Sequence, residues 1–285
     1  MLPCPPPGTR FEDPSLSWNR RGDEAHSNAE RGTRNAELGT GQRRLTADAA
    51  FRSDSQIPFV LLNMAMTADG KIASANRAIT SFGSRHDLEE LYALRATADA
   101  VMCGARTVDG ESVDLGPGPA RFRRSRLRHG LAEHNLRVIV SGSGSVDPAA
   151  RIFQRRFSPI IVLTAARIPG HRLNRLRDLA NDVFVCGERE IDFPEALRWL
   201  RQRWGVERLL CEGGGHLNDA LFRAQVVRRI HLTICPLVFG GRTAPMVADG
   251  TGFLRLAQAT SCRLKSRRRV GEELFLVYDV LPSAR

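Results

Sequence analysis

The chain has 285 residues, of which 42% are hydrophobic, so it can bury the core of one large or two small domains. Its formal net charge of +11, taken alone, would indicate an anionic partner such as nucleic acid, a membrane surface or a phosphorylated substrate. Lys71 and Lys265 are the only lysines, and a bias so strongly toward arginine can reflect genomic composition. We therefore give the charge little weight. No apolar stretch is long enough to span a bilayer.

The six cysteines are widely spaced and form no C-x-x-C pair of the kind expected of zinc or dithiol sites. Several end apolar runs, as Cys103 and Cys211 do, where a thiol usually packs as a small hydrophobic side chain. Reduced, structural cysteines fit a cytoplasmic protein. The first residues lack the basic and apolar regions of a signal peptide, so we expect a soluble, cytoplasmic chain without a metal site.

Residues 1–55 are rich in Pro, Gly, Arg, Glu, Asn and Ser and contain few aliphatic side chains. They show the periodicity of neither a strand nor a helix, so they cannot bury enough surface to offset the entropy lost on ordering. We expect a disordered N-terminal tail followed by a single domain over residues 56–282. The tail could be functional, a solvated extension, or the product of a start codon assigned too far upstream.

From residue 57 onward, short apolar runs alternate with longer amphipathic stretches, which is the pattern of an α/β fold. In chain order they predict a strand at 59–66, a helix at 87–97, strands at 100–103, 136–140, 160–164 and 183–186, a helix at 193–204, a strand at 208–211, a helix at 218–224, and strands at 229–235 and 274–280. The late position of the last strand favours a mixed central sheet with antiparallel C-terminal strands, flanked by helices.

The strongest single feature is a strand that ends in the glycine run 212–217 (EGGGHL) and leads into a helix. Backbone amides at such a turn and at the helix N-terminus can hold a phosphate without a side chain crowding it. The spacing matches neither G-x-G-x-x-G nor a Walker loop, and a glycine-rich turn is also common as a mere tight connection. The residues alone leave both interpretations open.

Three other predicted strands also end in small residues, at Gly104, at the turn 141–144 and at Gly187. In an open sheet the loops at the carboxyl ends of strands converge on one crevice, so four such turns could line a groove for a dinucleotide. A coincidence of separate turns is the alternative.

Other kinds of site have weak support. The sequence contains no H-E-x-x-H or G-x-S-x-G motif, and its seven histidines are scattered, so we assign neither a metal nor a nucleophile. The basic run 121–128 (RFRRSRLR) could contact RNA phosphates, but it matches no known nucleic-acid-binding motif. A solvated loop or helix face is the favoured interpretation of this run.

Four motifs occur in order along the chain: 63–73 (NMAMTADGKIA), 94–108 (LRATADAVMCGARTV), 212–218 (EGGGHLN) and 235–245 (CPLVFGGRTAP). In these motifs the sequence resembles the pyrimidine reductase domain of riboflavin biosynthesis, which has a dihydrofolate-reductase-like fold. The resemblance covers about residues 58–279. The absence of a preceding deaminase domain, together with Asn63 in the first strand, is more similar to the stand-alone archaeal form than to the bifunctional bacterial form.

The resemblance implies hydride transfer from NADPH to the ribosyl carbon of a (di)amino-ribosylamino-pyrimidinone 5′-phosphate, in a homodimer that binds neither nucleic acid nor membrane. It implies substrate contacts at Asn63, Arg95, Leu115 and Glu212. It implies cofactor contacts at Gly104, Thr107, Glu111, Ser141, Gly142, Ser143, Gly187, Gly213, Gly214, Gly215, His216 and Leu217. A guanidinium can hold a phosphate through two hydrogen bonds, and a carboxylate can accept from ribose hydroxyls. No residue is assigned as a catalytic acid or base, and no particular arginine can be named for a 2′-phosphate.

The chain departs from the family after Thr107, where an Asp-Asp-Pro followed by Leu and a basic residue is usual. Here the segment 109–118 reads DGESVDLGPG, in which Glu111 could stand in for the first Asp. A reductase of the same fold acting on another small heterocycle or carbonyl compound is therefore an alternative. A basic nucleic-acid-binding protein on an inactive reductase fold is an alternative of a different class.

Overall fold

The computed structural model describes residues 56–77, 82–109 and 113–282. All of them belong to the second of two compact units, Phe51–Arg285. The tail expected over residues 1–55 lies outside the described residues. Among those that are described, no helix combines the length and the apolar character needed to cross a membrane.

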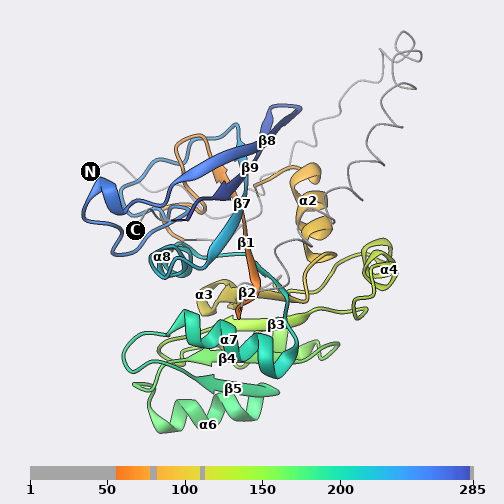
Figure 1. The fold of residues 1–285 in the computed structure, drawn as a ribbon, viewed down its shortest axis with the longest axis vertical. Coiled ribbons are helices and arrows are strands. Elements are labelled where there is room, and N and C mark those ends of the chain that lie inside the picture. The colour runs from red at the N-terminus through yellow and green to blue at the C-terminus, as the bar shows by residue number, and fades with distance from the viewer. Residues whose placement is uncertain (1–55, 78–81, 110–112, 283–285) are drawn as a thin grey trace, which may run out of the picture. The chain divides into compact units, whose positions relative to one another are not determined.

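A nine-stranded sheet runs through the domain in the order β5-β4-β3-β2-β6-β1-β7-β9-β8 (Figure 1). The first seven strands in this order are parallel, β9 pairs antiparallel to β7, and β8 pairs antiparallel to β9. Their bounds are β1 Phe59–Thr67, β2 Ala100–Gly104, β3 Leu136–Val140, β4 Ile160–Thr164, β5 Asp182–Val185, β6 Arg208–Cys211, β7 Val227–Cys235, β8 Cys262–Val270 and β9 Glu273–Val280. The predicted mixed sheet with an antiparallel C-terminal end is confirmed.

Helices cover both faces of the sheet and complete three layers. On one face, side chains of α7 and α8 pack against Val60, Leu62 and Met64 of β1. On the other face, residues of α2, α5 and α6 pack in a second cluster that includes Leu61. The helix bounds are α2 Arg85–Arg95, α3 Ala105–Val108, α4 Ala120–Arg128, α5 Arg151–Gln154, α6 Gly170–Leu179, α7 Phe193–Trp204 and α8 Gly215–Arg223, with a short 3₁₀ turn at Leu256–Gln258.

Local sequence explains where the predicted helix at 193–204 begins and ends. The Asp192 carboxylate accepts a hydrogen bond from the Glu195 amide at 2.9 Å and so caps the first turn of α7. Gly205 follows the last turn with φ of 66°, a left-handed conformation that glycine adopts without steric cost. The bounds of α7 are those predicted.

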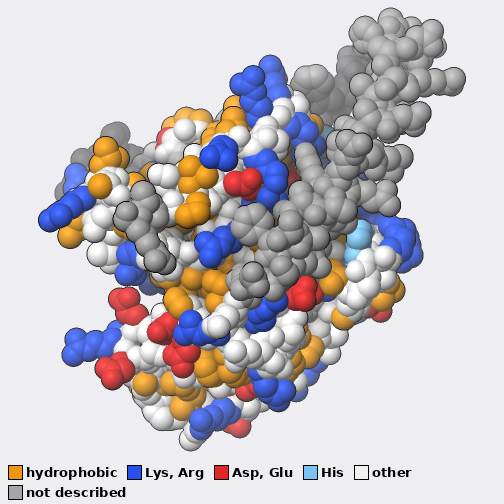
Figure 2. Space-filling view, viewed as in Figure 1, with side chains coloured by type: hydrophobic (Ala, Val, Ile, Leu, Met, Phe, Trp, Pro, Cys, Tyr) orange, Lys and Arg blue, Asp and Glu red, His pale blue; other side chains and the backbone are white. Residues whose placement is uncertain are grey.

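The basic run 121–128 forms most of α4, and one of its arginines is buried with its guanidinium hydrogen-bonded inside the protein. Arg126 is buried, and its guanidinium donates to the carbonyl oxygens of Arg95, Ala98 and Ala132 at 2.7, 2.5 and 2.8 Å. Burial lowers its pKa to about 10. The face seen in Figure 2 carries Lys and Arg side chains on several elements and not in one continuous patch.

Candidate active site

The four glycine- and serine-rich turns all follow parallel strands, so they lie at the same edge of the sheet. Gly104 ends β2, the turn 141–144 follows β3, Gly187 follows β5, and Gly213 follows β6. Because β6, β2 and β3 are neighbours in the sheet, three of these turns are adjacent. Direct contact joins two of them, since the Gly104 amide donates to the Gly213 carbonyl at 3.0 Å. This edge is where open α/β sheets bind ligands.

The glycine turn after β6 has no room for a side chain at Gly213 or Gly215. Gly213 and Gly214 have φ of 76° and 67°, and a β-carbon at Gly213 would lie 2.5 Å from the sulfur of Met64. At Gly215, the first residue of α8, a β-carbon would lie 2.5 Å from the Met246 carbonyl oxygen. The first amides of any α-helix have no intrahelical acceptor, so the start of α8 presents donors suited to an anion.

Other predicted cofactor residues surround this turn. The Thr107 hydroxyl, on α3, lies 3.7 Å from the position that a β-carbon at Gly214 would take. His216 is exposed at the start of α8, whereas the Leu217 side chain is buried in the core and can meet a ligand only through its backbone. The structure thus brings Thr107 beside the glycine turn. Glu111 lies outside the described residues.

Arg95 and Glu212, both expected to contact substrate, are bonded to each other. The Arg95 Nε and Nη2 atoms donate to the two carboxylate oxygens of Glu212 at 2.5 and 2.6 Å, and Nη1 donates to the Gly116 carbonyl at 2.6 Å. The two side chains are 10% and 11% exposed. The planar guanidinium is therefore already used in a two-bond contact with a carboxylate.

This pair fixes the charge state of the arginine. Burial alone would lower the pKa of Arg95, but the charge and hydrogen bonds of Glu212 outweigh it and the net pKa is raised. The guanidinium holds Glu212 at the end of β6, next to the glycine turn. Arg95 therefore positions the Glu212 carboxylate, whose remaining lone pairs can accept from a ligand.

The two other expected substrate residues differ in accessibility. Asn63 is 8% exposed on β1 and pairs in register with His231 of β7. Leu115 has no exposed surface, and its side chain belongs to the core cluster on the α2 face. Its φ is 56°, and its carbonyl accepts from the Asn135 side chain at 2.8 Å. Only the backbone of Leu115 is left to serve a ligand.

Two supporting residues were not predicted as part of the site. The Asn218 side chain, buried in α8, donates to the Val247 carbonyl at 2.6 Å and so holds the segment after β7 against the glycine turn. The Asp69 carboxylate accepts from the amides of Phe239 and Gly240 at 3.2 and 2.8 Å. Both belong to the quoted motifs, so a search for polar residues beside the glycines could have found them.

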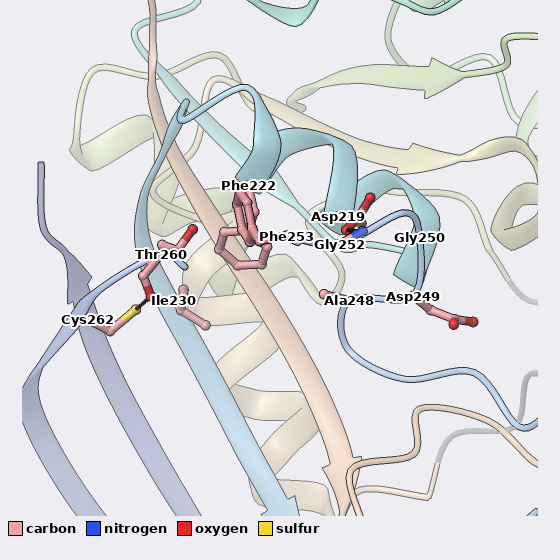
Figure 3. A pocket seen from close by; sticks show the side chains of 10 residues that line it. All are labelled: Asp219, Phe222, Ile230, Ala248, Asp249, Gly250, Gly252, Phe253, Thr260 and Cys262. Atoms are coloured by element: carbon pink, nitrogen blue, oxygen red, sulfur yellow. Dashed lines mark hydrogen bonds between the residues drawn. The ribbon is translucent and has the colours of Figure 1, made fainter. Parts of the chain in front are cut away.

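A hollow of about 360 Å³ lies along α8 and the start of β7 (Figure 3), and it adjoins the glycine turn through Asp249, whose amide donates to the Gly215 carbonyl at 3.0 Å. Phe222, Ile230 and Phe253 give it an apolar wall, and Asp219 accepts from the Gly252 amide at 3.0 Å. None of the predicted site residues lines it. Within the described part of the chain, no group of three or more His, Cys, Asp or Glu side chains is placed to hold a metal ion.

A mostly parallel sheet with an antiparallel C-terminal end and glycine turns at the carboxyl edge defines a class of α/β protein with a dihydrofolate-reductase-like fold. Solved structures agree. A pyrimidine reductase-like protein of Corynebacterium diphtheriae matches with a TM-score of 0.64 at 21% identity, covering 79% of this chain and 92% of that one. A riboflavin biosynthesis reductase of Saccharomyces cerevisiae matches with a TM-score of 0.60 at 16% identity, covering 86% and 100%. The expected fold is confirmed.

The RibD C-terminal domain model matches residues 58–276, and the chain belongs to this family. A 2,5-diamino-6-ribosylamino-4(3H)-pyrimidinone 5′-phosphate reductase of Methanothermobacter thermautotrophicus is 33% identical over 223 residues, which cover 78% of this chain and 98% of the relative. A reductase of the same name from Aquifex aeolicus is 27% identical and is covered over 99% of its length. The match to the riboflavin biosynthesis protein RibD of Actinobacillus pleuropneumoniae is 28% identical and covers 57% of that longer protein.

Proposed function

We propose that this chain is an NADPH-dependent reductase of riboflavin biosynthesis that acts on the ribosyl carbon of a (di)amino-ribosylamino-pyrimidinone 5′-phosphate. Relatives named as reductases of such a phosphate are covered over nearly their whole length. The observation that carries the proposal is the contact between the turns after β2 and β6, beside the buried Arg95–Glu212 pair. This contact supports the proposal because backbone amides suited to a phosphate then lie next to a fixed carboxylate.

The cofactor side fits a dinucleotide on the evidence of its backbone. Gly213 and Gly215 bring main chain close to Met64 and Met246, and a β-carbon at either position would force these neighbours apart. The start of α8 supplies amide donors for a pyrophosphate, while Thr107 adds a hydroxyl at the same turn. When bound, NADPH supplies the hydride, and the chain contributes orientation and exclusion of water.

On the substrate side, the proposal assigns the negative charge to Glu212. Its carboxylate is held by Arg95, so it does not need to reorient when it accepts hydrogen bonds from ribose hydroxyls or faces positive charge developing at the reacting carbon. Asn63 and the backbone at Leu115 complete the expected contacts. Arg95 acts through Glu212, because its own donors already have acceptors at Glu212 and Gly116.

One observation favours a second candidate function, a reductase of the same fold with another small heterocyclic or carbonyl substrate. The segment that departs from the family pattern reaches Arg95 directly, through the Gly116 carbonyl. A β-carbon at Gly116 would lie 2.8 Å from the Phe157 ring, so this segment is packed tightly. A changed segment at this position can alter the substrate while leaving the cofactor turn intact.

The test is a titration with NADPH and NADH, followed by turnover with the phosphorylated pyrimidine substrate, monitored by the absorbance of the reduced nicotinamide. Gly215→Ala should weaken NADPH binding by about 10-fold or more, because the extra methyl displaces the turn. Gly170→Ala is the matched control, since it also changes the first residue of a helix but meets no atom within 4 Å. Binding without turnover would support the second candidate, and no binding by the unmodified protein would refute both.

A further inference from the structure

An arginine side chain reaches the turn 141–144, which the proposed function assigns to the cofactor. The Nη2 atom of Arg167 lies 3.8 Å from the position that a β-carbon at Gly142 would occupy. Arg167 follows β4, the strand next to β3, so it approaches the turn from the neighbouring strand end. The glycine leaves the space beside this guanidinium open to a ligand.

The backbone of Arg167 is held firmly although its side chain is exposed. Its amide donates to the Glu188 carbonyl at 3.0 Å, and the amide of Ala166 donates to the Gly187 carbonyl at 2.9 Å. These bonds tie the segment after β4 to the segment after β5. The guanidinium therefore extends toward Gly142 from a fixed backbone, so only the side-chain entropy of Arg167 is lost when it binds a ligand.

A second cation lies at the same turn. Arg172, in the first half of α6, donates from Nη1 to the Ser143 carbonyl at 3.1 Å. Gly144 packs against the same helix, because its β-carbon would lie 3.2 Å from the Cβ of Arg172. Among the residues that the structure describes, the salt bridges use other arginines, so neither of these charges is neutralised by a carboxylate.

The spacing of the strands gives the distance between the turn 141–144 and the glycine turn after β6. Gly213 follows β6 and Ser141 follows β3, with β2 between them. At about 4.8 Å between neighbouring strands, the two turns are separated by roughly 10 Å. A ribose bonded to that pyrophosphate and carrying a 2′-phosphate can bridge most of that distance, so a dinucleotide with its pyrophosphate at Gly213 would direct its 2′-phosphate toward Gly142 and Arg167.

We propose that Arg167, assisted by Arg172, binds the 2′-phosphate of NADPH and makes the protein select NADPH over NADH. The inference rests on the proposed function, which names the cofactor but not the residue that distinguishes its two forms. A phosphate monoester is a dianion near neutral pH, and a guanidinium can donate two hydrogen bonds to it. NADH carries a hydroxyl at that position and gains little from Arg167.

The experiment measures dissociation constants for NADPH and NADH with the full-length protein and three variants. Wild type should bind NADPH at least about 10-fold more tightly than NADH, the effect of one charge-assisted hydrogen bond of roughly 1.5 kcal/mol. Arg167→Ala should lose at least about 10-fold in NADPH affinity and stay within about 2-fold for NADH. Arg172→Ala should show a smaller loss of the same kind.

The matched control is Arg175→Ala, an exposed arginine on the helix that carries Arg172, which should change neither constant. Equal affinity of wild type for NADPH and NADH would overturn the inference while leaving dinucleotide binding in place. A parallel loss of both affinities in Arg167→Ala would also overturn it, because it would indicate a general role in shaping the turn. Binding of neither nucleotide by wild type would refute the proposed function itself.

Discussion

Breaking the Arg95–Glu212 pair should destabilise the whole domain. Replacing Arg95 with methionine keeps much of the side-chain volume but leaves the Glu212 carboxylate about nine-tenths buried without its cation. It also leaves the Gly116 carbonyl without a donor that now lies at 2.6 Å. Removing one partner of a buried ion pair typically costs about 3–5 kcal/mol. For a domain of this size, that corresponds to a fall in Tm of roughly 10 °C.

The assay is equilibrium urea unfolding followed by circular dichroism, with a thermal melt alongside. Arg269→Met is the control, because the Arg269–Glu272 pair is 66% and 74% exposed and such a pair contributes below about 1 kcal/mol. The double variant Arg95→Met/Glu212→Leu should recover part of the loss, since no charge is then left buried. If Arg95→Met costs no more than Arg269→Met, the Arg95–Glu212 pair is solvated in solution and does not stabilise the fold.

Three further outcomes are expected. Burial raises the pKa of Asp87, so wild type should gain stability relative to Asp87→Asn as the pH falls through that raised pKa toward 3.8. Thermal melts at several pH values measure this, and a Tm difference between the two proteins that does not change with pH would contradict it. Glu273→Ala should cost roughly 2 kcal/mol in urea unfolding, because this buried carboxylate accepts two hydrogen bonds at the start of α2, whereas Glu272→Ala should stay within about 0.5 kcal/mol. We expect the homodimer to bury the exposed segment after β7, where the Leu254 side chain is 91% exposed. Leu254→Glu should therefore shift the mass measured by light scattering to that of a monomer, whereas Leu127→Glu, on α4, should leave the mass unchanged. A monomeric wild type would refute the dimer.

The strands could be predicted wherever apolar runs are buried on both faces. β2, β3 and β4 match the predicted ranges to within a residue for this reason. β8 was missed, because its sequence CRLKSRRRV has neither an apolar run nor strict alternation and most of its side chains are exposed. α6 was missed for a related reason, since it buries Leu176 but few other residues. Elements at the edge of the fold bury few apolar side chains, so their sequences show too little hydrophobic periodicity to be predicted.

Those parts of the candidate site that lie within one short stretch of sequence could be predicted. A glycine turn after a strand is visible in the chain, and Gly213 and Gly104 do meet. The bonding of Arg95 to Glu212 could not be predicted, because 117 residues separate them and no periodic pattern links them. Leu115 was expected at the substrate, yet its side chain fills the core. Motif position alone does not say which way a side chain points.

The outermost strand also governs how the molecules behave toward one another at high concentration. Among the described residues no strand pairs with the outer side of β8, and such an edge can template the growth of a sheet between molecules. Its exposed side chains are mostly basic: Arg263 and Arg267, together with Lys265, Arg268 and Arg269, whose charges Asp279, Glu90 and Glu272 partly offset. The mutual repulsion of the remaining positive charge keeps two such edges apart at about 0.01 M salt, where the screening length is about 30 Å, but it is largely lost at about 1 M, where that length is about 3 Å. Colloidal stability should therefore decrease as salt is added, so stocks of this protein should keep best at low ionic strength.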